Sequence, residues 1–568
     1  MSDYSEQQRR QWLLLLGCAL LVIGAGIGLR DPWPADEPRF ALAARHMVET
    51  GNWLFPQRGN EFYSDKPPVF MWLQASVHAL TGSWRLAFLL PSLLSGLLTL
   101  ALIYDLAWRL HGRRVALIAA ASLLFTLQFT IQTRAAQIDG VLVGMMTLAA
   151  YGLLRHQLLG PDWRWLWIGC FAAGIGTITK GVAFLALLII PLAMLGRRLH
   201  WQGLQKQPVQ LRNALIAALM FIGAICLWLL PMLYAVWRSA DPALEAYARD
   251  ILLGQTAARY LSAGHHQKPI WAYLEVILTL WLPTSIALIW AIPAWIKRWR
   301  RARRPARVLL PLAYVLALIA FFSLSSGKRG VYILPALPML VLALAPMLPA
   351  LLRRSAVQWS LFTAAALLAL SLCCAALLAL FANPAFAQRL DPLHGTGAWI
   401  VVLTMGLAGL FACAWMRPRR GAQAFAATLA GIWLLAGFAL YPLITDSRSA
   451  RAVMQQAGTM IGADAQLGLL SWKEQNLLMA DRPATVFGFL RPRAEQELEA
   501  VAWLRAEPKR RHLLVQGMNL QACFVAEKAR VVGSANRREW FLVDASALRD
   551  ACLPHSPEAW ERHRVAWH

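Results

Sequence analysis

A succession of long apolar runs limits what this chain can fold into. Hydrophobic residues make up 58% of its 568 residues, which is more than the core of a soluble protein of this size can hide. A helix rises 1.5 Å per residue, so roughly 20 apolar residues are enough to cross the ~30 Å of hydrocarbon in a bilayer. The runs match that length, and the sequence therefore predicts a polytopic α-helical membrane protein.

The basic residues gather in short clusters at the ends of the apolar runs. A net charge of +25 would suit a nucleic-acid partner, but clusters at helix ends are typical of the cytoplasmic side of a membrane. If all the arginine clusters from Arg9 to Arg420 lie on one side, the chain has about 13 spans and a cytoplasmic N-terminus. We therefore expect a lipid bilayer as the partner and no nucleic acid.

This topology divides the chain into two domains. Residues 1–444 form the transmembrane part, with large outer loops at 30–72 and 238–268. The first apolar run has no small-residue cleavage site, so it is expected to remain as a span. An odd number of spans places residues 445–568 on the same outer side as the two loops.

The C-terminal part is polar and mixed in pattern. Amphipathic helical stretches alternate with short apolar strands, for example at 466–471 and 511–517, which predicts a small α/β domain. Cys523 and Cys552 are the two cysteines outside apolar runs. In an oxidising compartment they can form a disulfide, and otherwise they remain free thiols; the sequence leaves both open.

An acidic pair, Asp36–Glu37, lies in the first outer loop just beyond the first span. It stands between Pro34 and Pro38 in a stiff setting, and Arg39 is placed to neutralise one of the acids. A carboxylate at the membrane surface can act as a base, orient a nucleophile or bind a metal. A solvated acidic pair without a catalytic role is the alternative, and the residues alone leave both open.

Further charged residues map to the same outer side. Lys66, near Arg58 and Tyr63, precedes two prolines where the chain returns to the membrane. It can hold a phosphate at headgroup depth, or it is an ordinary snorkelling lysine. Asp139 opens an apolar helix, where an unpaired carboxylate is costly, and Lys180 lies between two spans on the same side.

Two other outer segments add cations. Lys328 and Tyr332 lie in an outward turn where few basic residues are expected, which indicates an anion site or a statistical exception. The second large loop contains Arg259 and His266, and such a histidine is more often solvated than metal-bound. Together, the outer charges suggest an anionic substrate within the membrane, of which a lipid-linked phosphate is the simplest.

A set of short motifs follows in order between residues 25 and 340. They are Asp36-Glu37-Pro38-Arg39-Phe40, Gly51-Asn52-Trp53, Tyr63-Ser64-Asp65-Lys66-Pro67, Ile138-Asp139, Thr179-Lys180-Gly181, His266-Gln267-Lys268-Pro269-Ile270-Trp271 and Gly327-Lys328-Arg329-Gly330-Val331-Tyr332-Ile333-Leu334-Pro335. This ordered set resembles the bacterial aminoarabinose transferases. Those enzymes are relatives of the protein O-mannosyltransferases, within the GT-C class of polyprenyl-phosphate-sugar glycosyltransferases.

The resemblance implies a GT-C fold and an inverting sugar transfer at the periplasmic face of a bacterial inner membrane. The donor would be an undecaprenyl-phosphate sugar and the acceptor a lipid A phosphate. Asp65 stands where the aminoarabinose enzymes usually have Glu, so protein Ser or Thr or another envelope glycan or lipid remains an alternative acceptor. A lipid-linked sugar flippase or transporter is disfavoured, because the charges gather at one surface rather than at mid-membrane.

The resemblance also implies roles for individual residues. Asp36 and Glu37 would be the catalytic residues, with Asp36 positioning or deprotonating the acceptor. The donor phosphate would be bound by Lys66, Arg259, Lys328, Tyr332 and Arg58. Positive charge at this position stabilises the leaving phosphate. The substrate would be oriented by Arg39, Tyr63, Asp139 and Lys180. Asp65 and His266 are candidate ligands for a divalent metal ion, and no other cofactor is expected.

Overall fold

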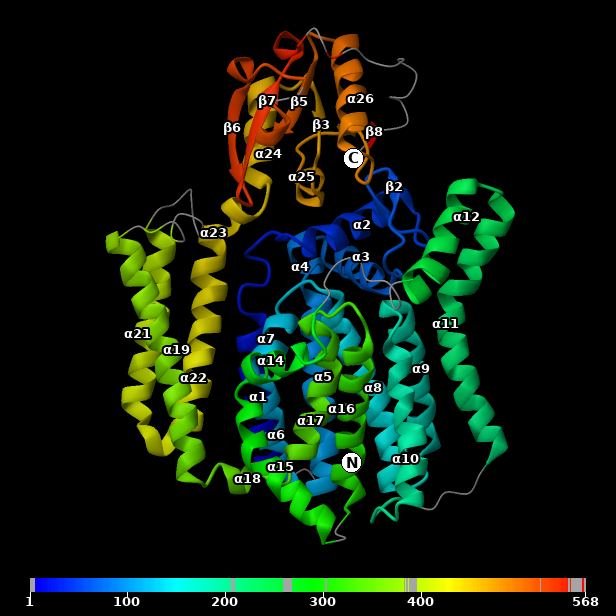
Figure 1. Ribbon diagram of the computed structural model, residues 1–568, viewed down its shortest axis with the longest axis vertical. Helices are drawn as coiled ribbons and strands as arrows, with labels where there is room; N and C mark the ends of the chain where they lie inside the picture. The colour runs from blue at the N-terminus through cyan, green and yellow to red at the C-terminus, as the bar shows by residue number, and fades with distance from the viewer. Residues whose placement is uncertain are drawn as a thin grey trace.

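The structure is a computed structural model that describes residues 6–205, 210–258, 268–301, 304–382, 384, 387, 396–520, 523–549, 552 and 564–565. A bundle of helices carries a mixed β-sheet at one end, and a layer of shorter helices lies between them (Figure 1). The predicted site residues Arg259 and His266 lie outside the described residues. 

Within the described residues, 7 helices are long and apolar enough to cross a membrane, or up to 9 if two bent pairs each count as one span. The expected number of about 13 spans stays a prediction. The main helices of the bundle are α1 (Glu6–Gly24), α5 (Leu90–His111), α6 (Arg113–Leu124), α7 (Leu127–Thr133), α8 (Ile138–Leu159), α9 (Trp163–Lys180), α10 (Ile189–Arg198), α11 (Leu211–Ser239), α14 (Ala272–Thr279), α15 (Thr284–Arg300), α16 (Ala306–Leu324), α17 (Leu337–Leu344), α19 (Ser355–Ala382), α21 (Gly397–Met416) and α22 (Gly421–Leu435).

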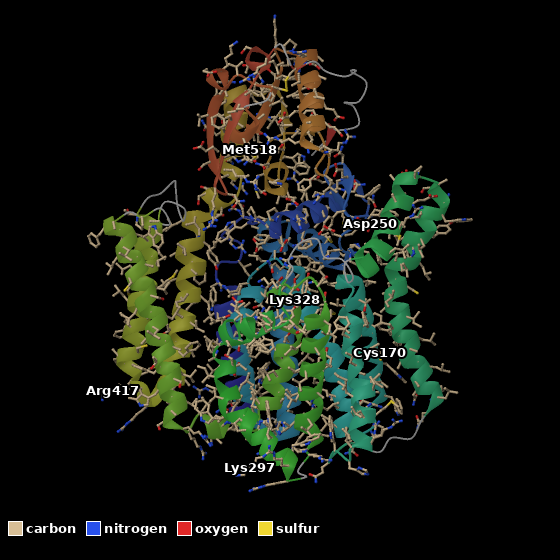
Figure 2. The ribbon with its side chains drawn as sticks, viewed as in Figure 1. Cys170, Asp250, Lys297, Lys328, Arg417 and Met518 are labelled. Atoms are coloured by element: carbon tan, nitrogen blue, oxygen red, sulfur yellow. A yellow bond between two sulfur atoms is a disulfide. The ribbon has the colours of Figure 1, made fainter. Side chains whose placement is uncertain are left out.

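The charge distribution follows the long axis of the molecule. Lys297, in the last turn of α15, and Arg417, just after α21, lie at the end of the bundle opposite the sheet (Figure 2). Basic side chains at this end are what the sequence predicts for the cytoplasmic side. The sheet and the outer loop 30–72 lie at the other end.

Two expected spans are broken. The run around 115–129 bends by 67° between α6 and α7, and the run around 271–295 bends by 112° between α14 and α15. The two breaks are hydrogen-bonded to each other. The backbone N–H groups of Leu127 and Gln128 donate to the carbonyls of Leu282 and Leu280 at 3.0 and 2.8 Å. Backbone groups that a helix break leaves without an intrahelical partner are tolerated at membrane depth only when other protein groups bond to them.

The first outer loop is an ordered layer between bundle and sheet. It contains α2 (Glu37–Thr50), the hairpin of β1 (Gln57–Arg58) and β2 (Glu61–Phe62), and leads into α3 (Val69–Thr81) (Figure 1). Phe40 and Met47 of α2 share one buried cluster with Trp472 from the C-terminal part. The loop is therefore fixed by packing on both of its faces.

The C-terminal part folds around a six-stranded sheet of order β6-β7-β5-β3-β4-β8. Strand β3 pairs in parallel with β4 and β5, and the other pairs are antiparallel. The elements are α24 (Arg451–Ile461), β3 (Gln466–Leu469), α25 (Glu474–Leu478), β4 (Ala484–Val486), α26 (Arg493–Ala506), β5 (Arg511–Gln516), β6 (Arg530–Ala535), β7 (Arg538–Val543) and β8 (Arg564–Val565). Cys523 and Cys552 form a disulfide.

Candidate active site

Asp36 lies at the N-cap of α2, where Pro38 in the first turn favours a helix start. Its two carboxylate oxygens contact different arginines, Arg39 Nη1 at 3.5 Å and Arg329 Nη2 at 3.2 Å. The Asp36 side chain keeps 18% of its surface exposed. Both contacts are single and long, so the carboxylate retains room to accept a hydrogen bond from a substrate.

Glu37, the next residue, is held differently. Its oxygens accept two hydrogen bonds from the Arg30 guanidinium, at 2.5 and 2.7 Å, one from the Trp33 backbone at 2.8 Å and one from the Ala136 backbone at 2.9 Å. Arg30 itself lies 4.7 Å from the centroid of the Trp33 ring. Four donors occupy the carboxylate, which gives Glu37 a structural role in joining the first loop to the segment before α8.

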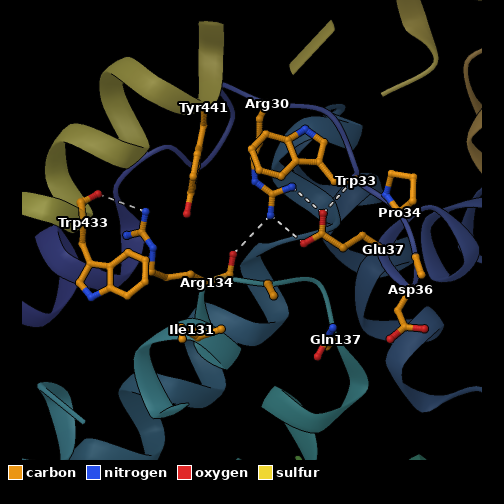
Figure 3. Close-up of a pocket in the computed structure, with 12 residues that line it drawn as sticks. Arg30, Trp33, Pro34, Asp36, Glu37, Ile131, Arg134, Gln137, Trp433 and Tyr441 are labelled. Carbon is orange, nitrogen blue, oxygen red and sulfur yellow. Dashed lines mark hydrogen bonds and ion pairs between the residues drawn. The ribbon is translucent and has the colours of Figure 1, made fainter. Parts of the chain in front are cut away.

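A cavity of about 270 Å³ opens beside Asp36 (Figure 3). Its walls come from the first loop, from the segment between α7 and α8, and from α22 and α23 (Tyr441–Arg448). Trp33, Ile131, Trp433 and Tyr441 supply apolar surface, and the charged lining residues are Arg30, Asp36, Glu37 and Arg134. Such a mixture suits a ligand with an apolar body and a polar reacting group.

Arg134 supports the wall of this cavity. Its guanidinium donates to the carbonyl of Ala25 after the end of α1 at 2.9 Å and to that of Trp433 in α22 at 3.2 Å. It also bonds the carbonyl of Val22. Arg134 thus caps α1 and ties it to α22, a role that is favourable for a cation at a helix C-terminus.

A second cluster connects the first loop with the C-terminal part. Glu474, at the start of α25, accepts a hydrogen bond from Arg39 Nε at 2.9 Å and lies 3.5 Å from Arg58 Nη1. Arg58 also lies over the Phe489 ring at 3.7 Å, and Tyr63 lies beside both arginines. Burial raises the pKa of Tyr63, which keeps its phenol neutral.

The cations of the bundle form a third group. Lys180 pairs with Asp139 at 2.5 Å and lies 4.9 Å from the centroid of the Tyr332 ring. Lys328 is buried, and its ammonium donates to the Ser325 carbonyl at 2.6 Å. Buried cations of this kind are costly without further acceptors, so the turn 325–332 is suited to an anion.

Gln128 positions that turn. Its amide donates to the Gly330 carbonyl at 2.8 Å and accepts from the buried Trp281 indole at 2.6 Å. Gln128 belongs to α7 at one helix break and Trp281 lies at the other. The broken spans therefore place the turn 325–332 at the outer end of the bundle.

Most of the predicted site residues are connected to one another by a series of contacts. Arg39 joins Asp36 to Glu474 and Tyr63; Arg329 joins Asp36 to the turn with Lys328; Tyr332 joins that turn to Lys180. Lys66 donates to the Asp65 carbonyl at 2.7 Å. Among the described residues, no three His, Cys, Asp or Glu side chains gather as metal ligands, so the metal site stays a prediction.

Comparisons with known proteins place the chain in a family. A family model described as "Dolichyl-phosphate-mannose-protein mannosyltransferase" matches residues 65–228. An undecaprenyl phosphate-α-4-amino-4-deoxy-L-arabinose arabinosyl transferase of Pseudomonas aeruginosa is 30% identical over 447 residues, 75% of each chain. The chain belongs to this aminoarabinose transferase family. The Pectobacterium carotovorum member is 29% identical over 330 residues, 55% of this chain and 54% of its own.

Solved structures show the fold of the family. The crystal structure of ArnT from Cupriavidus metallidurans bound to undecaprenyl phosphate superimposes with a TM-score of 0.69 at 19% identity, over 96% of this chain and 99% of ArnT. Its apo state gives a TM-score of 0.68 at 20% identity. The expected membrane fold of the GT-C type is confirmed. The alignments span only about half the length of the Pectobacterium and Sodalis members, at 54% each.

Proposed function

We propose that this protein transfers 4-amino-4-deoxy-L-arabinose from an undecaprenyl-phosphate donor to a lipid A phosphate. Membership of the aminoarabinose transferase family supports the substrate class. The observation that carries the proposal is the placement of Asp36, an incompletely paired carboxylate in the lining of a cavity that has both apolar and charged walls. A lipid-anchored acceptor can lie along those walls while its phosphate reaches Asp36.

Asp36 is our candidate catalytic residue. In an inverting transfer, an acceptor oxygen attacks the anomeric carbon from the face opposite the leaving phosphate, and the sugar–phosphate bond breaks. A lipid A phosphate is already anionic, so Asp36 would hold a remaining proton or the sugar rather than generate the nucleophile. Arg39 and Arg329 offset the charge of Asp36 and reduce its repulsion of an anionic acceptor.

The leaving undecaprenyl phosphate needs positive charge on the other side of the sugar. Lys328 and Lys66, with Tyr332, are the described candidates, and Arg259 is proposed with them. Asp139 orients Lys180 below Tyr332. Arg58 is already engaged with Glu474 and Phe489, so its proposed part is to support Arg39 and Tyr63.

The proposed topology places the reaction at the periplasmic face of a bacterial inner membrane. The N-terminus and the basic end with Lys297 would be cytoplasmic. The sheet domain, residues 445–568, would be periplasmic, which agrees with the Cys523–Cys552 disulfide. About 13 spans would satisfy this parity.

Transfer by the purified protein tests the proposal. Labelled undecaprenyl-phosphate aminoarabinose and lipid A in detergent should give labelled lipid A and free undecaprenyl phosphate, and the Asp36→Asn variant serves as the control. Wild-type protein that leaves both substrates unchanged would rule the proposal out. Adding EDTA examines Asp65 and His266 as metal ligands, since unchanged turnover argues against a required divalent ion.

The match to the mannosyltransferase family model favours one alternative, transfer of a polyprenyl-phosphate sugar to Ser or Thr of an exported protein. A hydroxyl is far less acidic than a lipid phosphate, so Asp36 would then have to act as a base. The mass of lipid A from cells with and without the gene separates the two. A loss of one amino-pentose supports lipid A as the acceptor, and an unchanged mass favours the alternative.

A further inference from the structure

Two arginines lie on neighbouring elements where the sheet touches the helical bundle. Arg448 is the last residue of α23, and Arg537 lies in the turn between β6 and β7. The backbone N–H of Asn536 in the same turn donates to the Ser447 carbonyl at 3.0 Å. The hairpin is therefore fixed on the end of α23, at the base of the sheet (Figure 1).

Neither arginine has a counter-ion in the part of the chain that the structure describes. Arg448 is half-buried and Arg537 is exposed, and no hydrogen bond or ion pair to a described residue involves either side chain. Asp31 forms ion pairs with Arg451 and Arg85, and Asp446 interacts electrostatically with Arg451. The positive charges of Arg448 and Arg537 repel each other. An anion between the two guanidinium groups would remove this repulsion.

The backbone at Arg537 adds a second observation. Asn536 and Arg537 have φ angles of +49° and +63°, and Ala535 pairs with Arg538, so the turn has two left-handed residues. Glycine is preferred at the second position of such a turn, because a side chain clashes with the backbone in the left-handed conformation. An arginine at this position keeps a charge at the expense of backbone stability, which points to a use for the charge.

The pair stands in line with the cavity. Tyr441, which lines the cavity, and Arg448 are 7 residues apart on α23. Seven residues are close to two helical turns, so both side chains lie on the same face, about 10 Å apart along the axis. The arginine pair therefore lies about two helical turns from the cavity wall, beyond the contact of Thr445 with Asp31 and Trp33 of the first loop.

We propose that Arg448 and Arg537 bind an anionic group of the phosphate class on the lipid acceptor, distinct from the group that receives the sugar. Each guanidinium group can donate two parallel hydrogen bonds to phosphate oxygens, so two arginines on neighbouring elements can hold one phosphate between them. This inference rests on the proposed function, since it names how the acceptor is held. The headgroup of a bulk anionic phospholipid offers the same chemistry and is the competing source.

Steady-state kinetics of the full-length protein in detergent test this site. The variants are Arg448→Gln and Arg537→Gly, with Arg510→Gln as a matched loss of charge at an exposed position. Either site variant should raise the KM for bis-phosphorylated lipid A about tenfold, equal to about 1.4 kcal/mol. The KM for the donor and kcat at saturating acceptor should stay unchanged, and Arg510→Gln should match wild type. An unchanged acceptor KM in both site variants overturns the proposal.

A mono-phosphorylated lipid A sharpens the assignment. With this acceptor, wild type should show the raised KM, and the variants should add no further increase, because the partner of the arginines is missing. Micelles with phosphatidylglycerol examine the other source: if this lipid raises the wild-type KM to that of the variants, the site takes bulk lipid and the acceptor assignment is wrong.

Binding without donor separates this inference from the proposed function. Wild type should bind bis-phosphorylated lipid A more tightly than the mono-phosphorylated form, and Arg448→Gln should lose that difference, even if no sugar is ever transferred. Arg537→Gly serves as the folding control, since glycine suits the turn and its melting temperature should equal or exceed that of wild type. Equal binding of both lipids by wild type would refute the arginine pair as a phosphate site.

Discussion

Asp36 and Glu37 are adjacent in the chain, yet their surroundings differ. Glu37 accepts four hydrogen bonds from Arg30 and two backbone N–H groups, and its side chain is 9% exposed. Asp36, which lines the same cavity as Glu37, has one long contact to each of two arginines and is 18% exposed. Chemistry at the membrane surface needs an acceptor with free capacity, and only one of the two acids has it.

The difference arises at the start of α2. Asp36 is the N-cap residue and Glu37 begins the helix, so their side chains leave the backbone in different directions. Glu37 points toward Arg30, whereas the Asp36 carboxylate points away from that pair, toward Arg39 and Arg329 (Figure 3). A rigid support thus lies directly beside the proposed catalytic group, which holds that group in position.

The largest effect is expected for Asp36→Asn. Loss of the carboxylate should lower kcat by about 10²–10⁴-fold, the range for a positioned acid or base. The melting temperature should change little, because the contacts of Asp36 with Arg39 and Arg329 are long and partly exposed. Turnover and scanning fluorimetry on the same preparation measure both. A variant with full turnover would contradict our assignment of Asp36.

The reverse pattern is expected for Glu37→Gln. An amide cannot balance the buried Arg30 charge, and removing one partner of a buried ion pair costs about 3–5 kcal/mol. The yield of folded protein and its melting temperature should fall, while kcat per folded molecule should stay within about threefold of wild type, because Glu37 would act only as support. A stable but inactive Glu37→Gln protein would reverse the comparison with Asp36.

Much of the fold follows from the sequence. Apolar run length and basic clusters indicated a helical membrane protein, and the motifs around Asp36, Lys66 and Lys328 indicated its family. Hydropathy could not reveal the breaks at α6–α7 and α14–α15, because an apolar run reads alike whether straight or bent. The short strands β4 and β8 were missed for lack of a clear alternation.

The supporting residues of the site were out of reach from sequence. Arg30, Gln128 and Glu474 act through partners 7, 202 and 435 residues away in the chain, and no local pattern marks such contacts. The sequence shows that Asp36 and Glu37 are charged, but it does not show how many hydrogen bonds each carboxylate accepts. The sequence therefore predicts Glu37 to be catalytic together with Asp36, although the hydrogen bonds of Glu37 favour a supporting role.

Removing the disulfide tests whether the active site depends on structure that is remote from Asp36 and Glu37. Replacing Cys523 by Ser removes a link that closes a separation of 29 residues, which should destabilise the sheet domain by about 2–4 kcal/mol. Proteolysis within residues 445–568 should become faster, whereas kcat should stay close to wild type if Glu474 still holds Arg39. A matched loss of turnover would mean that the site depends on the whole sheet domain.

Asp31 extends the comparison to a third carboxylate in the same loop. It is fully buried, and its oxygens accept from Arg451 Nε and Nη2 at 2.6 and 2.7 Å and from Arg85 Nε at 3.1 Å. Burial alone would raise the pKa of Asp31, but the hydrogen bonds and charges of Arg451 and Arg85 outweigh it and lower the pKa. Asp31 should therefore behave as Glu37 does, as support rather than as a catalyst.

The sign of the pH dependence follows from that shift. A carboxyl whose folded pKa is depressed contributes stability above its unfolded pKa, about 3.9 for Asp, and loses it as pH falls through the folded pKa. The Asp31 contribution should thus stay constant from pH 7 to about 4 and decline only below. In Arg451→Gln the decline should still begin near pH 4, where the unfolded pKa sets it, but it should be smaller and end at a higher pH, because the folded pKa of Asp31 is depressed less. Melting temperatures of both proteins between pH 3 and 7 measure this, and coinciding curves would show that Arg451 does not hold Asp31 in solution.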